Sequence, residues 1–290
     1  MSAPSRTAEL SASGPAPETG LATAVGPVRD PGTGTPAGAA PGADPGTANG
    51  PALDEASALT GVPHILDNPA YAALHGPHAR FAERVGRVVR YQLDVSPWLG
   101  MPEEPGPQDW ADLAALVGPD TEVPLPATGV TLPEGWTLVD RLAGVQFVDA
   151  GLVAAHDAEA VRLGPADVPE MLDLVARTRP GPFLPRTVEL GTYLGIRRGG
   201  ALVAMAGERL RPPGWTEISA VCTDPGHQGQ GLAARLVRAV AAGVRDRGEV
   251  PFLHTSARNT HAIRVYEHMG FRLRRTTEFG AARTPPAAGR

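Results

Sequence analysis

The chain has few of the residues that several kinds of protein chemistry require. Its 290 residues include a single cysteine, Cys222, and no lysine, so all 26 basic residues are arginine. One cysteine excludes an intramolecular disulfide and a cysteine-rich zinc site, and it fits a reducing compartment, which predicts a cytoplasmic protein. The absence of lysine excludes a lysine Schiff base and the lysine of a P-loop.

Long apolar runs and excess positive charge are also missing. No stretch reaches the roughly 18 uninterrupted apolar residues of a membrane helix, and the first residues lack the basic segment and apolar core of a secretory signal. The net charge of −5 and the pI near 5.9 argue against a nucleic-acid partner. The 8 histidines are scattered without the spacing of a metal site, so no metal is expected.

Composition divides the chain into four parts. Residues 1–56 are rich in Ala, Pro and Gly, which predicts a disordered tail. Residues 57–150 predict an N-terminal α+β region, in which the apolar spacing of residues 78–90 indicates a helix and the β-rich residues 137–148 indicate a strand. Residues 159–279 have the strongest signals and predict a mixed α/β domain, and residues 280–290 are expected to form a flexible C-terminal tail.

Periodicity and turn residues predict the order β-α-α-β-β-β-α-β-α-β within residues 159–279. Asp167 with Glu170 forms an Asp-x-x-Glu capping box, which predicts the start of the first helix. Asn259 is expected to cap the last helix and Gly270 to end it in the left-handed conformation. The other expected strands and helices, given by residue numbers, are strands 160–163, 193–198, 201–210, 216–223, 251–257 and 271–279, and helices 187–191 and 228–247.

A strand, a turn and a glycine-rich helix start follow one another between residues 217 and 234. Free backbone N–H groups at a helix N-terminus carry partial positive charge, and glycines let a phosphate approach the backbone closely. The segment Gly229 to Ala234 therefore predicts a pyrophosphate site. The segment matches neither a P-loop nor a Gly-x-Gly-x-x-Gly fingerprint. A glycine-rich helix entry that binds nothing is the alternative interpretation.

Two motifs carry a resemblance to a known family. Gln228-x-x-Gly231-x-Ala233, preceded by Val221-Cys222-Thr223-Asp224-Pro225, resembles the acyl-CoA-binding signature of the GNAT superfamily of N-acetyltransferases. The run from Asn259 through Tyr266 to Gly270-Phe271 resembles the second GNAT signature.

The resemblance covers about residues 159–279 and looks closest to the branch that includes glycine-acyltransferase-like proteins. Residues 57–150 are similar to the extra N-terminal region of such two-part proteins, a degenerate GNAT-like half. The resemblance implies an α/β (α+β) fold with a mixed, mostly antiparallel sheet and helices on both faces.

The resemblance also implies acetyl-CoA as cosubstrate. Strand backbone at 221–223 would hold the pantetheine arm, and the loop amides would hold the pyrophosphate. The implied cofactor-binding residues are Val221, Cys222, Thr223, Gln228, Gly229, Gln230, Gly231, Leu232, Ala233, Ala234, Asn259 and Tyr266.

Tyr266 and Glu217 are the implied catalytic residues. A phenol of pKa about 10 is suited to protonating a departing thiolate, although Tyr266 could also simply pack against the helix's inner face. Glu217 stands where family members carry a catalytic base, and strand alternation predicts that it shares a face with Val221. An ordinary edge-strand glutamate is equally compatible with that position, and Glu208, His254 and His261 are alternative bases. Alternation turns Cys222 toward the core, so we do not expect it to be a nucleophile.

The sequence thus predicts an acetyl-CoA-dependent N-acetyltransferase that moves an acetyl group to a primary amine by direct attack. The acceptor would be a small-molecule or peptide amine, and the protein a monomer or homodimer. A catalytically silent GNAT-fold protein that binds CoA as a sensor or scaffold is the first alternative, and an unrelated nucleotide-binding module is the second.

Overall fold

A computed structural model of the chain describes residues 64–125 and 129–287. The tail expected over residues 1–56 lies outside the described residues. Eight strands form one central sheet in the order β4-β11-β5-β10-β9-β8-β7-β6. Neighbouring strands are antiparallel except β9 and β10, which run parallel. The strands are β4 (Glu122–Pro124), β5 (Thr137–Asp149), β6 (Val161–Leu163), β7 (Tyr193–Arg198), β8 (Ala201–Glu208), β9 (Trp215–Thr223), β10 (Val250–Ser256) and β11 (Phe271–Arg283).

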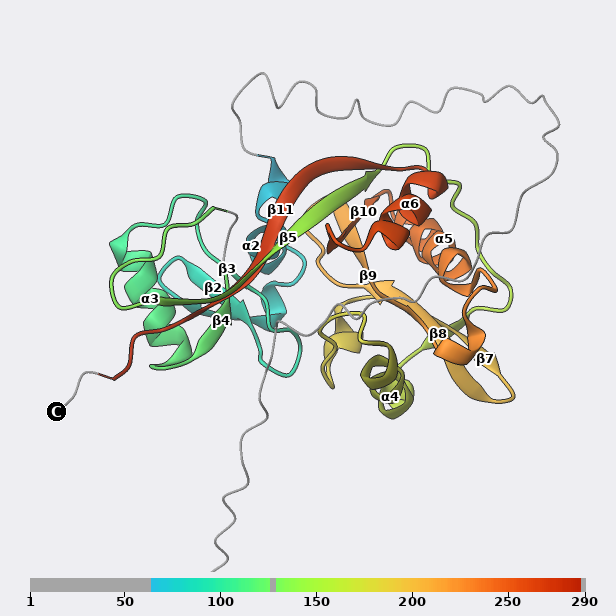
Figure 1. The fold of residues 1–290 in the computed structure, drawn as a ribbon, viewed down its shortest axis with the longest axis horizontal. Helices are drawn as coiled ribbons and strands as arrows, with labels where there is room; N and C mark the ends of the chain where they lie inside the picture. Colours follow the sequence, from blue (N-terminus) through green and yellow to red (C-terminus); the bar gives the residue numbers. More distant parts are fainter. Residues whose placement is uncertain (1–63, 126–128, 288–290) are drawn as a thin grey trace, which may run out of the picture.

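Helices cover both faces of this sheet, which confirms the predicted fold class (Figure 1). Leu236 of α5 and Met269 of α6 belong to one hydrophobic core with Ile218 of β9. Met171 of α4 belongs to a second core with Met205 of β8, on the opposite face. The helices of this part are η4 (Pro165–Asp167), α4 (Val168–Thr178), η5 (Thr187–Leu190), η6 (Pro225–His227), α5 (Leu232–Asp246) and α6 (Thr260–Met269).

Two helix starts differ from the sequence prediction. α5 begins at Leu232 rather than at residue 228, because Gly231 adopts the left-handed conformation and interrupts helical geometry. The Asp167 carboxylate does not cap α4; it accepts a hydrogen bond from the backbone N–H of Gly164 instead. Asn259 and Gly270 cap the two ends of α6 as predicted.

The N-terminal region has its own three-stranded sheet, flanked by short helices. The helix expected over residues 78–90 is wrong: β1 and β2 form a hairpin there, and Gly86 supplies the positive φ of the turn. The apolar residues instead serve the hairpin, in which Val88, Val89 and Tyr91 of β2 are buried. The elements of this region are η2 (Ile65–Asp67), α2 (Pro69–Leu74), η3 (Ala79–Phe81), β1 (Ala82–Val85), β2 (Val88–Tyr91), β3 (Leu99–Gly100) and α3 (Pro107–Val117).

The central sheet crosses the expected boundary between residues 57–150 and 159–279. β5 pairs with β10 and β11, and β4 adds a further edge strand to β11. Figure 1 shows β5 and β11 as a long curved ribbon that joins the two parts. The expected flexible tail over residues 280–290 also differs, because residues 280–283 continue β11, and Ala281 and Ala282 are buried against β4 and β5.

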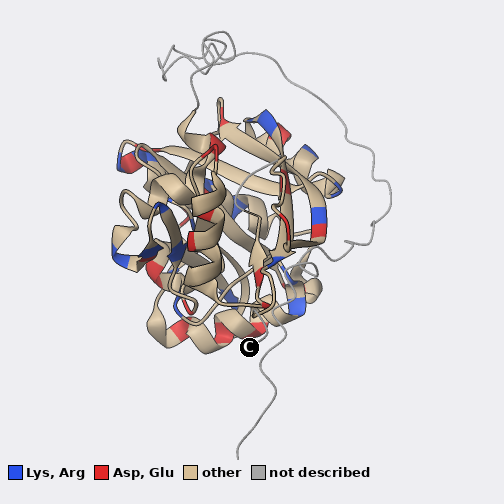
Figure 2. Ribbon diagram, turned by 90° about the vertical axis from the view of Figure 1, so that its left-hand side faces the viewer, with Lys and Arg blue, Asp and Glu red and all other residues tan. Residues whose placement is uncertain are grey.

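Charged residues of both signs are interspersed along the whole described chain (Figure 2). Arginines pair with acids across elements, such as Arg197 of β7 with Glu170 of α4 and Arg235 of α5 with Asp157. Among the described residues, none of the helices has the length and apolar character needed to cross a membrane. The same residues contain no group of three or more His, Cys, Asp or Glu that could hold a metal ion.

Candidate active site

The site lies where β9 and β10 separate. The two parallel strands pair from Trp215 with Val250 as far as Glu217 with Phe252, and beyond that point they diverge. A cavity of about 720 Å³ opens between the diverging ends. Because β10 no longer pairs with it, the edge of β9 from Ile218 onward offers backbone hydrogen-bonding groups to whatever occupies the cavity.

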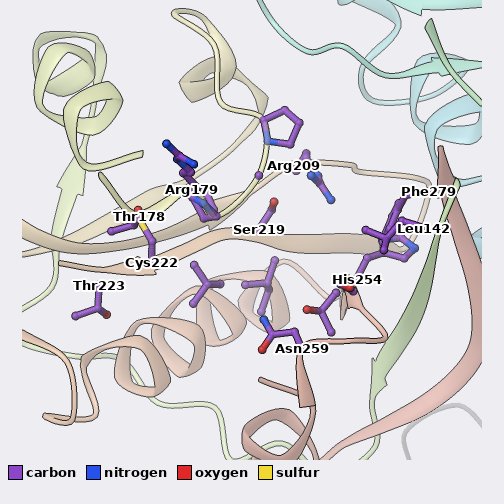
Figure 3. A pocket seen from close by; sticks show the side chains of 18 of the residues that line it. Leu142, Thr178, Arg179, Arg209, Ser219, Cys222, Thr223, His254, Asn259 and Phe279 are labelled. Atoms are coloured by element: carbon purple, nitrogen blue, oxygen red, sulfur yellow. The ribbon is translucent and has the colours of Figure 1, made fainter. Parts of the chain in front are cut away.

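The cavity is lined by segments from across the chain, and Figure 3 shows many of these side chains. Its lining residues include Trp98, Asp140, Leu142, Arg177 to Pro182, Arg209, Ile218 to Thr223, Pro225, Gln228, His254 to Ser256, Asn259, Tyr266 and Phe279 to Ala281.

A bulge in β9 shapes the cavity wall. Ala220 has a φ of 53°, and the β8–β9 register shifts by one residue beside it. As a result Ile218 and Val221, three residues apart, both pack toward the core beside α5, whereas Cys222 packs toward α4. The predicted alternation from 217 to 223 is therefore wrong, and Glu217 lies on the face opposite Val221.

The loop before α5 leaves its backbone donors available. Among the described residues, none accepts a hydrogen bond from the N–H groups of residues 228 to 234. Gly229 and Gly231 have φ values of 77° and 72°, and a Cβ atom added to either would meet nothing within 4 Å. Open space and unpaired donors are what a bound diphosphate requires. The structure thus places the predicted pyrophosphate loop at the end of the cavity marked by Thr223 and Gln228.

Val221, Cys222 and Thr223 all line the cavity, as do Gln228, Asn259 and Tyr266, whereas residues 229–234 lie beyond its end. The Thr223 hydroxyl is buried and has no hydrogen-bond partner among the described residues. Cys222 is a free, buried thiol, and burial raises its pKa to about 11. A thiol with so high a pKa is a poor nucleophile, as the sequence analysis expected.

Asn259 and Tyr266 reach the cavity from α6. The Asn259 side-chain oxygen accepts from the backbone N–H of Ala262 at 3.2 Å, so the residue caps the helix while it lines the cavity. The Tyr266 ring packs between Phe147 and Phe271, with centroid distances of 6.5 and 6.0 Å. Burial raises the pKa of the phenol to about 12, so the hydroxyl keeps its proton throughout the neutral range.

Glu217 is wholly buried and fully engaged. Arg209 donates to both of its carboxylate oxygens at 2.9 and 2.6 Å, and Nδ1 of His254 lies 2.7 Å from Oε1. Burial alone would raise the pKa of this carboxyl, but the Arg209 charge outweighs that effect and holds it well below its usual range. A carboxylate with so low a pKa is a weak proton acceptor, which argues against Glu217 as the base.

His254 connects Glu217 to a second buried side chain that the sequence analysis missed. The amide nitrogen of Gln146 lies 2.9 Å from Nε2 of His254 and donates to the carbonyl of Leu66 at 2.8 Å. The amide oxygen accepts from Arg274 at 2.6 Å, which fixes the amide orientation. Nε2 of His254 is thus an acceptor, and Nδ1–H donates to Glu217. No local sequence pattern signals this network, because its side chains come from four separate strands and the Leu66 carbonyl from a fifth element, η2.

The two other alternative bases do not line the cavity. Glu208 is buried, and its carboxylate pairs with Arg247 at 3.0 Å. His261 is exposed on the outer side of α6.

Comparison with known proteins shows which family the chain resembles. The family model described as FR47-like protein matches residues 193–280. A solved structure from Novosphingobium aromaticivorans, assigned to the GNAT family of acetyltransferases, is 38% identical with a TM-score of 0.70, and the alignment covers 78% of this chain and 100% of that one. This chain belongs to the GNAT family.

Two further relatives show how far the GNAT likeness extends. N-alpha-acetyltransferase RimI of Mycobacterium tuberculosis is 38% identical over 82 residues, which are 27% of this chain and 51% of the relative. The chain thus matches about half the length of that curated relative. A GCN5-related N-acetyltransferase from Kribbella flavida is 18% identical with a TM-score of 0.53, over 77% of this chain and 96% of that one, and it shows a shared fold.

Proposed function

We propose that the protein transfers an acetyl group from acetyl-CoA to a primary amine. The observation that supports this most directly is a cavity that the open edge of β9 borders and whose Gln228 end leads to the unpaired amides that precede α5. The GNAT membership and the RimI likeness support the same activity. A single buried cysteine fits a reducing compartment, and we place the reaction in the cytoplasm.

The chain's residues fit coenzyme A along the length of the cavity. The β9 edge at Val221 to Thr223 would pair with the amides of the pantetheine arm, and the orphaned Thr223 hydroxyl would gain a partner there. The backbone amides of Gly229 to Ala234 and the positive end of α5 would hold the diphosphate. Acetyl-CoA supplies an activated thioester, whose carbonyl carbon the amine attacks.

Tyr266 is our proposed acid. It lines the cavity, its hydroxyl has no hydrogen-bond partner among the described residues, and its raised pKa keeps it protonated. The phenol would donate its proton to the thiolate as the thioester carbon–sulfur bond breaks, and the proton that the attacking nitrogen loses would restore the phenol. A backbone N–H of the unpaired β9 edge would polarise the carbonyl oxygen.

We propose a role for Glu217 that differs from the catalytic base that the sequence suggested. Its carboxylate holds Arg209 and His254 in the cavity wall and neutralises the arginine, so it acts as a positioning residue. Removing its charge would leave a buried guanidinium without a counterion, which is strongly destabilising.

A coupled assay tests the proposed activity. Purified protein, acetyl-CoA and a panel of primary amines are mixed, and the release of free CoA thiol is followed together with the mass of the acetylated amine. We expect thiol release that depends on the amine. Tyr266→Phe should lower kcat by about a hundredfold or more while CoA still binds, since the phenol acts only as the bond breaks.

Tyr71→Phe is the matched control, because Tyr71 lies on α2, outside the cavity, and should keep full activity. CoA binding without turnover on any amine would favour a silent sensor or scaffold over an enzyme. ATP binding without CoA binding would contradict both interpretations.

A further inference from the structure

The end of the cavity away from Thr223 is built from three separate parts of the chain. Arg209 follows β8, Leu142 and Phe279 lie on the long β5–β11 ribbon, and Trp98 comes from the N-terminal region just before β3. Figure 3 shows Arg209, Leu142 and Phe279 grouped near His254, with Thr223 at the opposite end. Coenzyme A enters from the Thr223 end, so this group faces the acceptor.

Trp98 brings an unpaired hydrogen-bond donor to this wall. Its indole Nε1–H is buried and has no acceptor among the described residues. An indole nitrogen can only donate, and a buried donor without a partner costs free energy that a bound acceptor atom would recover. The ring is held in place by Phe279 at a centroid distance of 6.4 Å.

Arg209 offers a second donor beside the first. Its guanidinium carbon lies 5.2 Å from the centre of the Trp98 ring, so the two groups are neighbours. Nε and Nη2 donate to Glu217, whereas Nη1 donates to none of the described residues. The Arg209 side chain is 11% exposed, and the residue lines the cavity.

We propose that Trp98 and Arg209 form a subsite for a carbonyl oxygen on the acceptor, so that the acceptor is an α-amino carbonyl compound. This inference rests on the proposed acetyl transfer and adds the acceptor's chemical class. An amino acid and the N-terminus of a peptide both have a carbonyl group on the carbon that bears the amine. Two N–H donors on neighbouring side chains of one cavity wall match that oxygen.

The charge of the wall favours a neutral carbonyl over a free carboxylate. Glu217 already neutralises Arg209, so the subsite offers donors without a net positive charge. Leu142 and Phe279 give the neighbouring wall apolar and aromatic surface, which suits an apolar side chain on the acceptor. A peptide-like amide with a leucine side chain therefore combines the required features.

Three acceptors that differ in one group test the subsite. Leucinamide carries the neutral carbonyl, leucine carries a carboxylate, and isoamylamine is leucine without its carboxyl group. Their kcat/KM values are compared per unprotonated amine, which removes the difference in amine basicity. We expect leucinamide to exceed isoamylamine by about a hundredfold, because a site with buried donors rejects a ligand that cannot pair with them. A higher kcat/KM for leucinamide than for leucine indicates a peptide acceptor. A higher kcat/KM for leucine indicates a free amino acid.

Trp98→Phe removes the N–H together with the five-membered part of the indole, and it keeps a six-membered aromatic ring beside Arg209 and Phe279. We expect it to lower the leucinamide-to-isoamylamine ratio at least tenfold. Trp136→Phe is the control, because Trp136 packs on Trp110 outside the cavity, and its ratio should match that of the unaltered protein.

Equal kcat/KM values for leucinamide and isoamylamine would overturn the subsite while leaving the acetyl transfer intact. A leucinamide-to-isoamylamine ratio that Trp98→Phe leaves unchanged would also overturn the subsite. If no amine is acetylated, the proposed activity fails, and calorimetry on the CoA complex then decides the subsite. Leucinamide that binds at least tenfold more tightly than isoamylamine would support it, and equal affinities would refute it.

Discussion

At the scale of single residues, His78 shows how a buried polar side chain ties the N-terminal region to the central sheet. Its Nδ1 accepts from the Tyr91 hydroxyl at 2.9 Å, and its Nε2 lies 3.1 Å from the carbonyl of Leu190. The Leu190 carbonyl can only accept, so Nε2 carries a proton, and in the neutral ring Nδ1 is then the acceptor. Burial lowers the pKa of His78 to about 4, so the folded protein resists protonation at this point.

This residue predicts a pH dependence of stability. The folded pKa lies below the unfolded value of 6.5, so the stabilisation is fully present above pH 6.5 and is lost as the pH falls toward 4. The loss reaches up to about 3 kcal/mol at the acid end. His78→Gln keeps one donor and one acceptor without titrating, and it should flatten the dependence between pH 6.5 and 4.5.

Thermal unfolding of both proteins across that range provides the measurement. His261→Gln is the control, because His261 is exposed on α6. The range stops at pH 4.5 because Glu217 and Asp67, whose pKa values are lowered, begin to lose their own stabilisation below it. An identical slope in His78→Gln and the unaltered protein would contradict this account.

At the scale of elements, the strand–loop–helix unit from β9 to α5 determines the proposed cosubstrate site. The Ala220 bulge turns the end of β9, and Gly231 delays the helix start, so that unpaired amides gather in the loop. A side chain at Gly231 would enter the open space beside the loop, where an added Cβ meets no protein atom and where the proposed diphosphate would lie.

Gly231→Val should weaken CoA binding about tenfold or more, a change of roughly 1.4 kcal/mol. Gly248→Val is a closely matched control. Gly248 has a φ of 74° against 72° for Gly231, and its Cβ would also meet nothing, but it follows the far end of α5. Both variants carry a similar backbone strain of about 1–2 kcal/mol. Calorimetry with CoA separates them, and equal affinities in the two variants would contradict the assigned loop.

The sequence was informative about this unit and much less so about its partners. The Gly-rich segment, the Asn259 cap and the Gly270 end follow from local chemistry. The two caps lie as predicted, whereas α5 begins at Leu232 rather than at residue 228. The face of Glu217 was predicted wrongly, because a non-glycine residue in the left-handed conformation carries no local signal. The partners of Glu217 are 8 and 37 residues away, and the fold alone brings them together.

At the scale of the whole molecule, the N-terminal region is part of the proposed site rather than an appendage. β5 lies in the middle of the central sheet, and the core around Phe252 of β10 includes Leu66 and Tyr91 of the N-terminal region. Trp98 extends the same region into the cavity. A boundary after residue 150 separates β5 from the strands it pairs with. The pattern of residues 137–148 predicts that a strand exists, but it does not show which strands that strand pairs with.

The central claim is that the main chain between Gly229 and Ala234 binds the diphosphate of coenzyme A. Amide hydrogen exchange, followed residue by residue with and without saturating CoA, tests it most directly. The account predicts that CoA markedly slows exchange of these amides and of those along the open edge of β9. Tight CoA binding that leaves exchange in the loop unchanged would contradict it.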